Sequence, residues 1–262
     1  MMKKLNFLSV LTLAIISLLL CMDSVYAKVD QHTVAAWTFD EGQGNFTEDV
    51  SGNGHDGELL AGAEWSKDGK FGDAIQFDGI DAYVEIPHAE DLNLEAFTIE
   101  AWVNCTPGAN QAIMQKQGAS SNDRNYILNI RPEGFLRGSF SSGGTQYNFD
   151  GPTLLQAGEW YHVAATYDGE VGRIYVNGEL DGETNLDFTL EPNDAPLLLG
   201  KAGGTGGARL NGLMDEVRLS NIARTQEEIK QLMNKGLALV LAVDAEGKLA
   251  ITWGAVKFWI FD

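Results

Sequence analysis

The chain has little cysteine, proline and histidine, and it is short of basic residues. Its 262 residues include two cysteines, six prolines and four histidines, and 18 Lys or Arg face 37 Asp or Glu, for a net charge of −19. With so few cysteines, a sizeable core or bound metal must stabilise the fold. The negative charge argues against nucleic acid, heparin-like polymers and anionic membranes as partners, because each would be repelled.

Long apolar runs are also scarce, and the one that occurs lies at the start of the chain. Two lysines precede a nearly apolar stretch at 5–20, and Ala27 ends the polar break that follows. This order is typical of a secretory signal peptide, so we expect cleavage after Ala27 and an extracellular or periplasmic location. A lipoprotein anchor at Cys21 is disfavoured because Leu20 stands where a small residue is usual. The run is shorter than the roughly 20 residues of a spanning helix, so no membrane span is expected after cleavage.

Short alternating segments between glycine-containing turns predict antiparallel β-structure. Residues 97–104 alternate best, with Phe97 and Ile99 on one face and Thr98 on the other. Asn177-Gly178 predicts a tight hairpin, because a type I′ turn needs positive φ at both central residues. Further strands are expected at 34–39, 74–77, 82–86, 126–130, 135–140, 160–167, 173–176, 197–199 and 210–219.

Three tryptophans and a histidine lie within these expected strands, and we expect them in the core. They are Trp37, Trp102, Trp160 and His162. A turn at Asp78-Gly79 is expected to join two strands as a hairpin. Cys105 is the only thiol left after signal cleavage, and a buried apolar role is expected for it.

One helix is predicted late in the chain. Thr225 and Glu228 have the spacing of a capping box, and Ile229, Leu232 and Met233 form one apolar face. Gly236 then stands where a helix C-cap glycine belongs.

We therefore expect three segments. These are a signal peptide at 1–27, one β-sandwich domain with a short C-terminal helix at 28–236, and an appended β-hairpin at 237–262. The strands of the hairpin are expected at 237–243 and 248–253. Its apolar tail at 258–261 needs cover from the domain or from a partner.

Several segments, in order from about residue 33 to 234, together resemble the bacterial laminin-G-like modules of the concanavalin A-like superfamily. They are 37–42, 51–57, 71–79, 83–86, 97–103, 160–169, 212–219 and 221–223. The resemblance implies an all-β, two-sheet antiparallel jelly-roll sandwich. It leaves function open, because lectins, adhesion modules and glycosidases share this fold.

The sequence lacks the residue patterns of the common hydrolytic sites. Retaining glycosidases need two carboxyl groups about 5–5.5 Å apart, and related glucanases carry Glu-x-Asp-x-x-Glu on one strand, a run that is missing here. Glu100 shares its strand face with Thr98 and Trp102, and a regular strand would point Asp215 and Glu216 to opposite faces. The histidines are scattered, so we expect no enzyme. A glycoside hydrolase or lyase of the same fold remains the alternative.

Calcium is the cofactor that the residues favour. It takes 6–8 oxygen ligands, and acidic residues beside glycine-rich turns supply them. Asp40, Asn53 and Asp56 meet that description. The family resemblance places the first and last core strands side by side, which would bring Asp215 towards Asp40, where relatives often hold calcium. The alternative is that all four residues only stabilise turns.

For a ligand, aromatic and amide side chains in loop or edge positions are the candidates. They are Trp65, Tyr147, Asn122, Asp123 and Arg124. The leading hypothesis is a secreted, non-catalytic binding or adhesion module that recognises an extracellular glycan or protein and is stabilised by calcium. A further alternative is a structural interaction protein that uses its apolar C-terminal tail.

Overall fold

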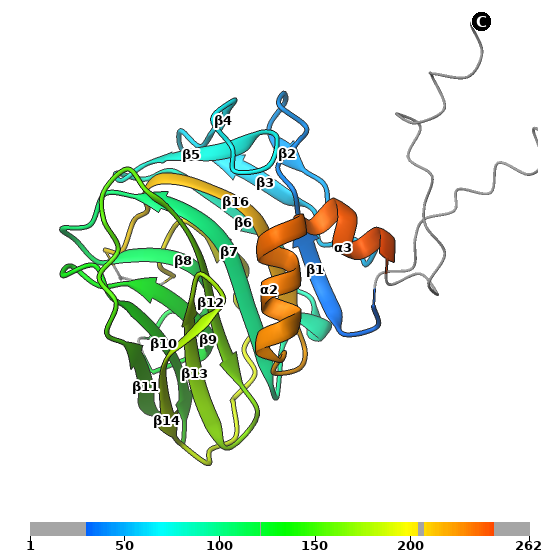
Figure 1. Cartoon of the computed structure of the whole chain (residues 1–262). Coiled ribbons are helices and arrows are strands. Elements are labelled where there is room, and N and C mark those ends of the chain that lie inside the picture. The colour runs from blue at the N-terminus through cyan, green and yellow to red at the C-terminus, as the bar shows by residue number, and fades with distance from the viewer. Residues whose placement is uncertain (1–29, 121, 204–206, 244–262) are drawn as a thin grey trace, which may run out of the picture.

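The computed structural model describes residues 30–120, 122–203 and 207–243, and within them the strands form two antiparallel sheets of eight strands each (Figure 1). Sheet A runs in the order β14-β13-β12-β7-β16-β5-β4, and β1 also pairs with β16. Sheet B runs in the order β11-β10-β9-β8-β15-β6-β3-β2. The two layers confirm the predicted jelly-roll sandwich.

The strands of sheet A are β1 (Thr33–Trp37), β4 (Glu64–Ser66), β5 (Ala74–Asp78), β7 (Phe97–Cys105), β12 (Trp160–Tyr167), β13 (Val171–Val176), β14 (Glu179–Asn185) and β16 (Asn211–Ser220). Those of sheet B are β2 (Phe46–Thr47), β3 (Gly57–Leu60), β6 (Tyr83–Ile86), β8 (Gln111–Gln117), β9 (Arg124–Ile130), β10 (Leu136–Ser142), β11 (Thr145–Gly151) and β15 (Leu197–Leu199). A single 3₁₀ turn, η1 (Glu90–Leu92), follows β6.

The core lies between the sheets and follows the predicted alternation. Phe97 and Ile99 of β7 are fully buried in it, as is Trp37 of β1. Cys105 is also buried there as a free thiol. Burial raises the pKa of this thiol to about 11, so it stays protonated at neutral pH. The expected apolar role of Cys105 is confirmed.

Two of the predicted turns had different outcomes. Asn177 and Gly178 both have positive φ, 50° and 75°, and join β13 to β14 as predicted. The expected hairpin at Asp78-Gly79 is wrong, because β5 belongs to sheet A and β6 to sheet B. Asp78 Oδ1 accepts backbone N–H groups from residues 80, 81 and 82. The turn therefore carries the chain from one sheet to the other.

Helix α2 (Gln226–Lys235) has the predicted capping box, with Thr225 and Glu228 bonded reciprocally. It lies across the outer face of sheet A (Figure 1), where Ile229 packs against Ala164 and Tyr175. Gly236 ends it with φ 72°, as expected of a C-cap glycine. None of the helices in the described residues is long and apolar enough to cross a membrane.

The expected strand at 237–243 is wrong, because these residues form helix α3 (Leu237–Val243). An apolar run of this length fits a strand and a buried helix equally well. Leu237, Val240 and Leu241 recur at helical spacing and pack with Ala36 and Leu232. The helix is favoured over a strand because it buries this apolar face against β1 and α2. The second expected strand, at 248–253, and the apolar tail lie outside the described residues.

Candidate functional site

The outer face of sheet A is built from β16, β7 and β12, whose side chains stand in register. Asp215, Trp102 and His162 form one row across the three strands. Arg218, Glu100 and Ala164 form the next row. Paired residues of adjacent strands share a face, so each row is one layer of neighbouring side chains. Helix α2 covers the second row, through Ile229 on Ala164, and the first row lies beside the end of that helix.

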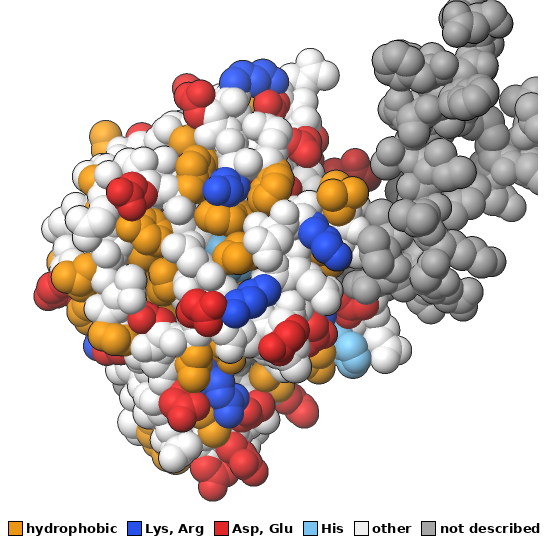
Figure 2. Space-filling model, viewed as in Figure 1, with side chains coloured by type: hydrophobic (Ala, Val, Ile, Leu, Met, Phe, Trp, Pro, Cys, Tyr) orange, Lys and Arg blue, Asp and Glu red, His pale blue; other side chains and the backbone are white. Residues whose placement is uncertain are grey.

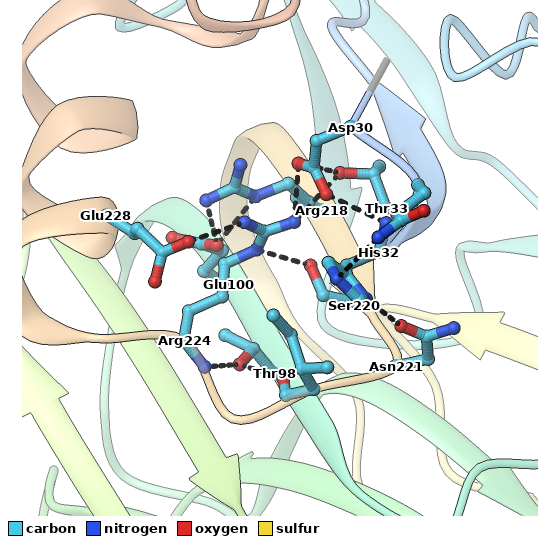
Figure 3. Close-up of polar contacts among 12 residues, drawn as sticks. Asp30, His32, Thr33, Thr98, Glu100, Arg218, Ser220, Asn221, Arg224 and Glu228 are labelled. Atoms are coloured by element: carbon cyan, nitrogen blue, oxygen red, sulfur yellow. Dashed lines mark hydrogen bonds and ion pairs between the residues drawn. The ribbon is translucent and has the colours of Figure 1, made fainter. Parts of the chain in front are cut away.

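The covered row holds a buried ion pair. Arg218 Nε and Nη2 lie 2.7 and 2.6 Å from Glu100 Oε1, and both side chains are at most 1% exposed. Figure 3 shows this pair with the guanidinium of Arg224 beside it. The carboxylate of Glu100 is therefore held by an arginine under a helix.

Arg224 connects three parts of the chain around this row (Figure 3). It donates to Asp30 at 2.6 Å, to Ser220 at 2.8 Å and to Glu228 at 3.2 Å. Charge-assisted hydrogen bonds of this kind are stronger than neutral ones. The network joins the start of the domain, β16 and α2, and we call this part of the outer face the closed half.

The row of Trp102 opens instead into a groove of about 470 Å³. Figure 2 shows hydrophobic side chains on this face of the molecule, with Lys or Arg and Asp or Glu side chains among them. We call the hollow the outer-face groove. Its lining residues are Lys70, Phe71, Trp102, Trp160, Asn177, Met233 and Asn234.

Two of the tryptophans expected in the core therefore lie elsewhere. Trp102 is 6% exposed but is buried on the outer face of sheet A, and Trp160 is only partly buried. Both alternate with the core-facing positions of their strands, on the same face as Thr98 and Glu100. That polar face was the signal in the sequence. His162, by contrast, is fully buried as expected, although it too lies on this outer face.

Around Trp102, the groove is rich in aromatic contacts and cationic or N–H donors. Lys70 Nζ lies 4.1 Å from the centre of the Trp102 ring, and the Phe71 ring packs edge-on at 6.4 Å. The ring of His162 also packs edge-on against Trp102, with 5.5 Å between the two ring centres. In the described part of the chain, Trp102 Nε1 and both ring nitrogens of His162 are buried without a hydrogen-bond partner.

His162 is neutral in this setting. Burial lowers its pKa to about 3, and the positive charge of Arg218 acts in the same direction. A neutral imidazole keeps one N–H donor and one acceptor. Asn177 Oδ1 accepts the backbone N–H of His162 at 3.0 Å, which leaves the amide NH₂ of Asn177 at the groove.

Behind the groove wall lies an acidic cluster of Asp40, Asp215 and Glu216. Strand β1 pairs with β16, which confirms that the first and last core strands are neighbours. A bulge in β16 after Asp215, with φ 54° at Glu216, breaks the regular alternation expected for the pair. Asp215 Oδ2 accepts the backbone N–H groups of residues 70 and 71, and Glu216 accepts that of Leu237.

Burial has the largest effect on the pKa values of Asp215 and Glu216. It raises the pKa of Asp215 to about 7, with a further contribution from the charge of Asp40, while N–H donors oppose the shift. It raises the pKa of Glu216 to about 8, and here Asp215 and Asp40 both add to the shift. Asp215 Oδ1 is buried without a partner in the described residues. Carboxylates crowded in this way favour a cation.

Asn53 and Asp56, the other two residues expected to bind metal, lie in a separate loop and form structural hydrogen bonds there. Asn53 donates to the carbonyls of Thr33 and Val34, and Asp56 accepts the backbone N–H of Asp49. Asp49 is buried and accepts four hydrogen bonds from its surroundings. The loop is therefore organised by Asp49, and the structure brings together only Asp40 and Asp215 of the predicted set.

The residues expected to bind a ligand are spread over the molecule. Trp65 lies on β4 at one end of sheet A, and its indole donates to the carbonyl of Gly44. Tyr147 lies on β11, the terminal strand of sheet B, and stacks on Phe188 at 3.8 Å. Residues 122–124 lead into β9, where Arg124 binds Gln117. The structure does not gather them into one site.

A second hollow, of about 370 Å³, lies on sheet B and was not predicted. Its lining includes Phe46, His55, Asp56, Glu58, Glu85 and His88. Nearby, His88, Glu90 and Asp194 place one ligand atom each within 4.8 Å of one another, although the two carboxylates are 88% and 97% exposed. The His-x-Glu spacing was the signal available in the sequence. Lys116 Nζ lies 3.1 Å from the remaining ring nitrogen of His88.

Fold and groove together define a lectin-like jelly-roll domain. A family model described as "Concanavalin A-like lectin/glucanases superfamily" matches residues 78–230, which is more than half of the chain. The chain therefore belongs to this superfamily, as the sequence resemblance predicted.

Individual similar proteins agree on the fold. Pappalysin-1 of Mus musculus is 25% identical over 179 residues, which cover 60% of this chain and 11% of that protein. The binding domain of Paraclostridial Mosquitocidal Protein 1 superposes with a TM-score of 0.63 at 16% identity, over 78% of this chain and 52% of that one. Domain 4 of a GH43 extracellular arabinanase from Geobacillus stearothermophilus, in complex with arabinotriose, superposes at 0.60 with 21% identity, over 77% and 98%.

Proposed function

We propose that this chain is a secreted, non-catalytic module that binds carbohydrate in the outer-face groove. The observation that carries the proposal is one groove lined by Trp102 and Trp160, with Lys70 and Asn177 among its polar lining residues. Ligand sites are concave, mostly apolar, and contain a few polar groups that fix orientation. Indole rings supply the apolar face on which a sugar ring packs, and N–H groups bind its oxygens.

Binding without catalysis fits the distribution of carboxylates. Glycoside hydrolysis uses two carboxyl groups that flank the bond, whereas no Asp or Glu lines the described outer-face groove. Glu100, the nearest carboxylate on β7, is committed to Arg218. The arabinotriose complex of the similar arabinanase domain supports a glycan as ligand.

The groove is tested with the variant Trp160→Ala and the control Trp65→Ala. Both tryptophans are partly buried in sheet A, but Trp65 lies on β4, away from the groove. After a glycan array has identified a ligand, we expect Trp160→Ala to weaken binding about tenfold, roughly 1.4 kcal/mol in calorimetry. Trp65→Ala should bind like the parent. Equal losses of glycan affinity in both variants would show that the outer-face groove is not the binding site.

A screen for hydrolysis of common polysaccharides separates this proposal from the enzymatic alternative. We expect no release of reducing ends by the purified chain. Sustained release that is lost in a carboxylate variant would assign the chain to the glycosidases of this fold instead.

We further propose that Asp40 and Asp215 hold a stabilising calcium ion. The supporting observation is Asp215 Oδ1, a buried oxygen without a partner, beside a second carboxylate. Calcium accepts such oxygens together with backbone carbonyls and water. The donor atoms of Asp40, Asp215 and Glu216 do not converge within 4.8 Å in the described residues, so carbonyl or water oxygens would have to complete the shell. Asn53 and Asp56 are not part of this proposal.

Metal removal tests it directly. A ligand that binds only the folded state stabilises it by about 2.7 kcal/mol at a concentration 100 times its Kd. We therefore expect EDTA to lower the Tm by several degrees and added Ca²⁺ to restore it. In Asp215→Asn the same treatment should have no effect. An unchanged Tm in the parent chain, with no Ca²⁺ uptake in calorimetry, would contradict the proposal.

A further inference from the structure

The two hollows of the molecule differ in charge. The hollow on sheet B is lined by Asp56, Glu58 and Glu85. The outer-face groove has no Asp or Glu among its described lining residues, and its one charged residue is Lys70. In a chain with 37 acidic and 18 basic residues, a concave surface free of carboxylates is informative. It indicates a groove that admits a ligand of negative charge.

Lys70 is the first donor in this groove. Several described basic side chains bind carboxylates, as Lys67 does with Asp73 and Lys230 with Glu179, whereas Lys116 and Lys201 do not. In the same part of the chain, Lys70 makes no ion pair, and its ammonium lies over the Trp102 ring. An ammonium offers three donors and no acceptor. Lys70 is exposed, so its charge is available to a ligand.

Trp102 supplies a second, independent observation. The residue is 94% buried, its indole N–H can only donate, and it has no acceptor among the described residues. A buried donor without an acceptor destabilises the unliganded protein. The amide NH₂ of Asn177 adds another donor at the rim. Lys70, Trp102 and Asn177 thus supply donors that a ligand with acceptor oxygens would satisfy.

We propose that the outer-face groove binds a saccharide residue that carries a carboxylate group. The proposal rests on the function proposed above and specifies its ligand class. The carboxylate, which accepts only, meets Lys70 and the neighbouring N–H donors, while the sugar ring packs on the partly exposed Trp160. Charge-assisted hydrogen bonds of this type are about twice as strong as neutral ones.

The charge of the whole molecule limits the ligand to few acidic groups. A net charge of −19 repels a polyanion at long range. A single carboxylate within contact distance of Lys70 is screened from that field at physiological salt, where the Debye length is about 8 Å. The buried carboxylate of Asp215 lies nearby, and its Oδ2 accepts the backbone N–H groups of residues 70 and 71. We therefore expect a short acidic glycan rather than a heparin-like chain.

Matched sugars that differ only in the acid test the proposal. Methyl glucuronide is compared with methyl glucoside, and sialyllactose with lactose, by calorimetry and by tryptophan fluorescence on the full chain. We expect at least one acidic sugar to bind about tenfold more tightly than its neutral partner, with the preference falling as salt increases. Equal affinity within both pairs would overturn the proposal while leaving a carbohydrate-binding function intact.

Substitution of the lysine locates the effect. Lys70→Met keeps the aliphatic stem and removes the charge, so the acidic sugar should lose about tenfold in affinity and its preference over the neutral partner should disappear. Lys201→Met is the matched control, because Lys201 Nζ lies 3.7 Å over the ring of Tyr83 in sheet B, outside the groove. It should keep the preference. A preference that survives Lys70→Met would overturn the proposal, and failure of every saccharide to bind any variant would overturn the proposed function itself.

Discussion

The closed half and the outer-face groove use the same three strands and differ in how their polar groups are satisfied. In the closed half, Glu100 Oε1 meets Arg218 at 2.6 Å, although Glu100 Oε2 has no hydrogen-bond partner in the described residues. In the groove, one row away on the same strands, Trp102 Nε1 has no acceptor in the described residues. Both rows come from polar positions that alternate with the core. Helix α2 covers the row of Glu100, which stabilises the fold. It leaves the row of Trp102 open to a ligand.

This difference has a physical consequence for substitutions. A buried ion pair contributes little when compared with apolar packing, but removing one partner leaves an uncompensated charge. A groove residue, by contrast, contributes mainly to the complex. Changes in the closed half should therefore alter stability and spare binding, while changes in the groove should do the reverse, as expected for Trp160→Ala.

The largest effect is expected for Arg218→Met. The substitution leaves the carboxylate of Glu100 fully buried without its cation, which typically costs about 3–5 kcal/mol. Urea denaturation monitored by tryptophan fluorescence measures the loss. The control is Arg137→Met, whose pair with Asp150 is 25% and 40% exposed and is expected to contribute at most about 1 kcal/mol. Equal losses would show that α2 does not isolate the closed half from water.

A smaller effect is expected for Thr225→Ala. Thr225 accepts the N–H of Glu228 and forms the capping box of α2, and loss of an N-cap side chain costs about 1 kcal/mol. The free energy of unfolding should fall by that amount, with the affinity of the groove unchanged. A change in glycan affinity as large as the change in stability would show that the helix that covers one half also controls the other.

Sequence patterns predicted the parts of the molecule that depend on local spacing. Alternation in β7, the turn at Asn177-Gly178 and the capping box at Thr225 each depend on residues within a few positions of one another. The family resemblance added the pairing of β1 with β16, which brings Asp40 towards Asp215. Long-range features were harder to predict.

The features that could not be predicted depend on what covers a surface. Trp102 and Trp160 are apolar enough for a core, and the pattern does not show that α2, far along the chain, leaves their row open. The bulge at Glu216 depends on β16 changing its partner from β5 to β1. Helix α3 replaced a strand because Ala36 and Leu232 offered it an apolar surface. Trp65 and Tyr147 were both candidates for ligand binding because they were expected in loop or edge positions, and they belong to opposite ends of the sandwich.

The smallest effect concerns acid stability at the edge of the closed half. Burial alone would raise the pKa of Asp30, but Arg224, together with hydrogen bonds from His32 and Thr33, outweighs it and lowers the pKa below the usual 3.8. A carboxylate with a lowered pKa stabilises the folded state above its unfolded pKa, and this contribution is lost as the pH falls through the folded value.

Asp30→Asn should therefore be less stable than the parent chain at neutral pH, and the difference should shrink as the pH falls below 3.8. Urea denaturation of both chains at several pH values measures it, with the difference rather than either curve as the readout, because other carboxylates titrate in both. Since Asp30 is partly exposed, its contribution is screened and smaller than that of Arg218. A difference that stays constant with pH would mean that Asp30 acts only as a neutral acceptor for Arg224, and that the charge holding the closed half together lies between Glu100 and Arg218 alone.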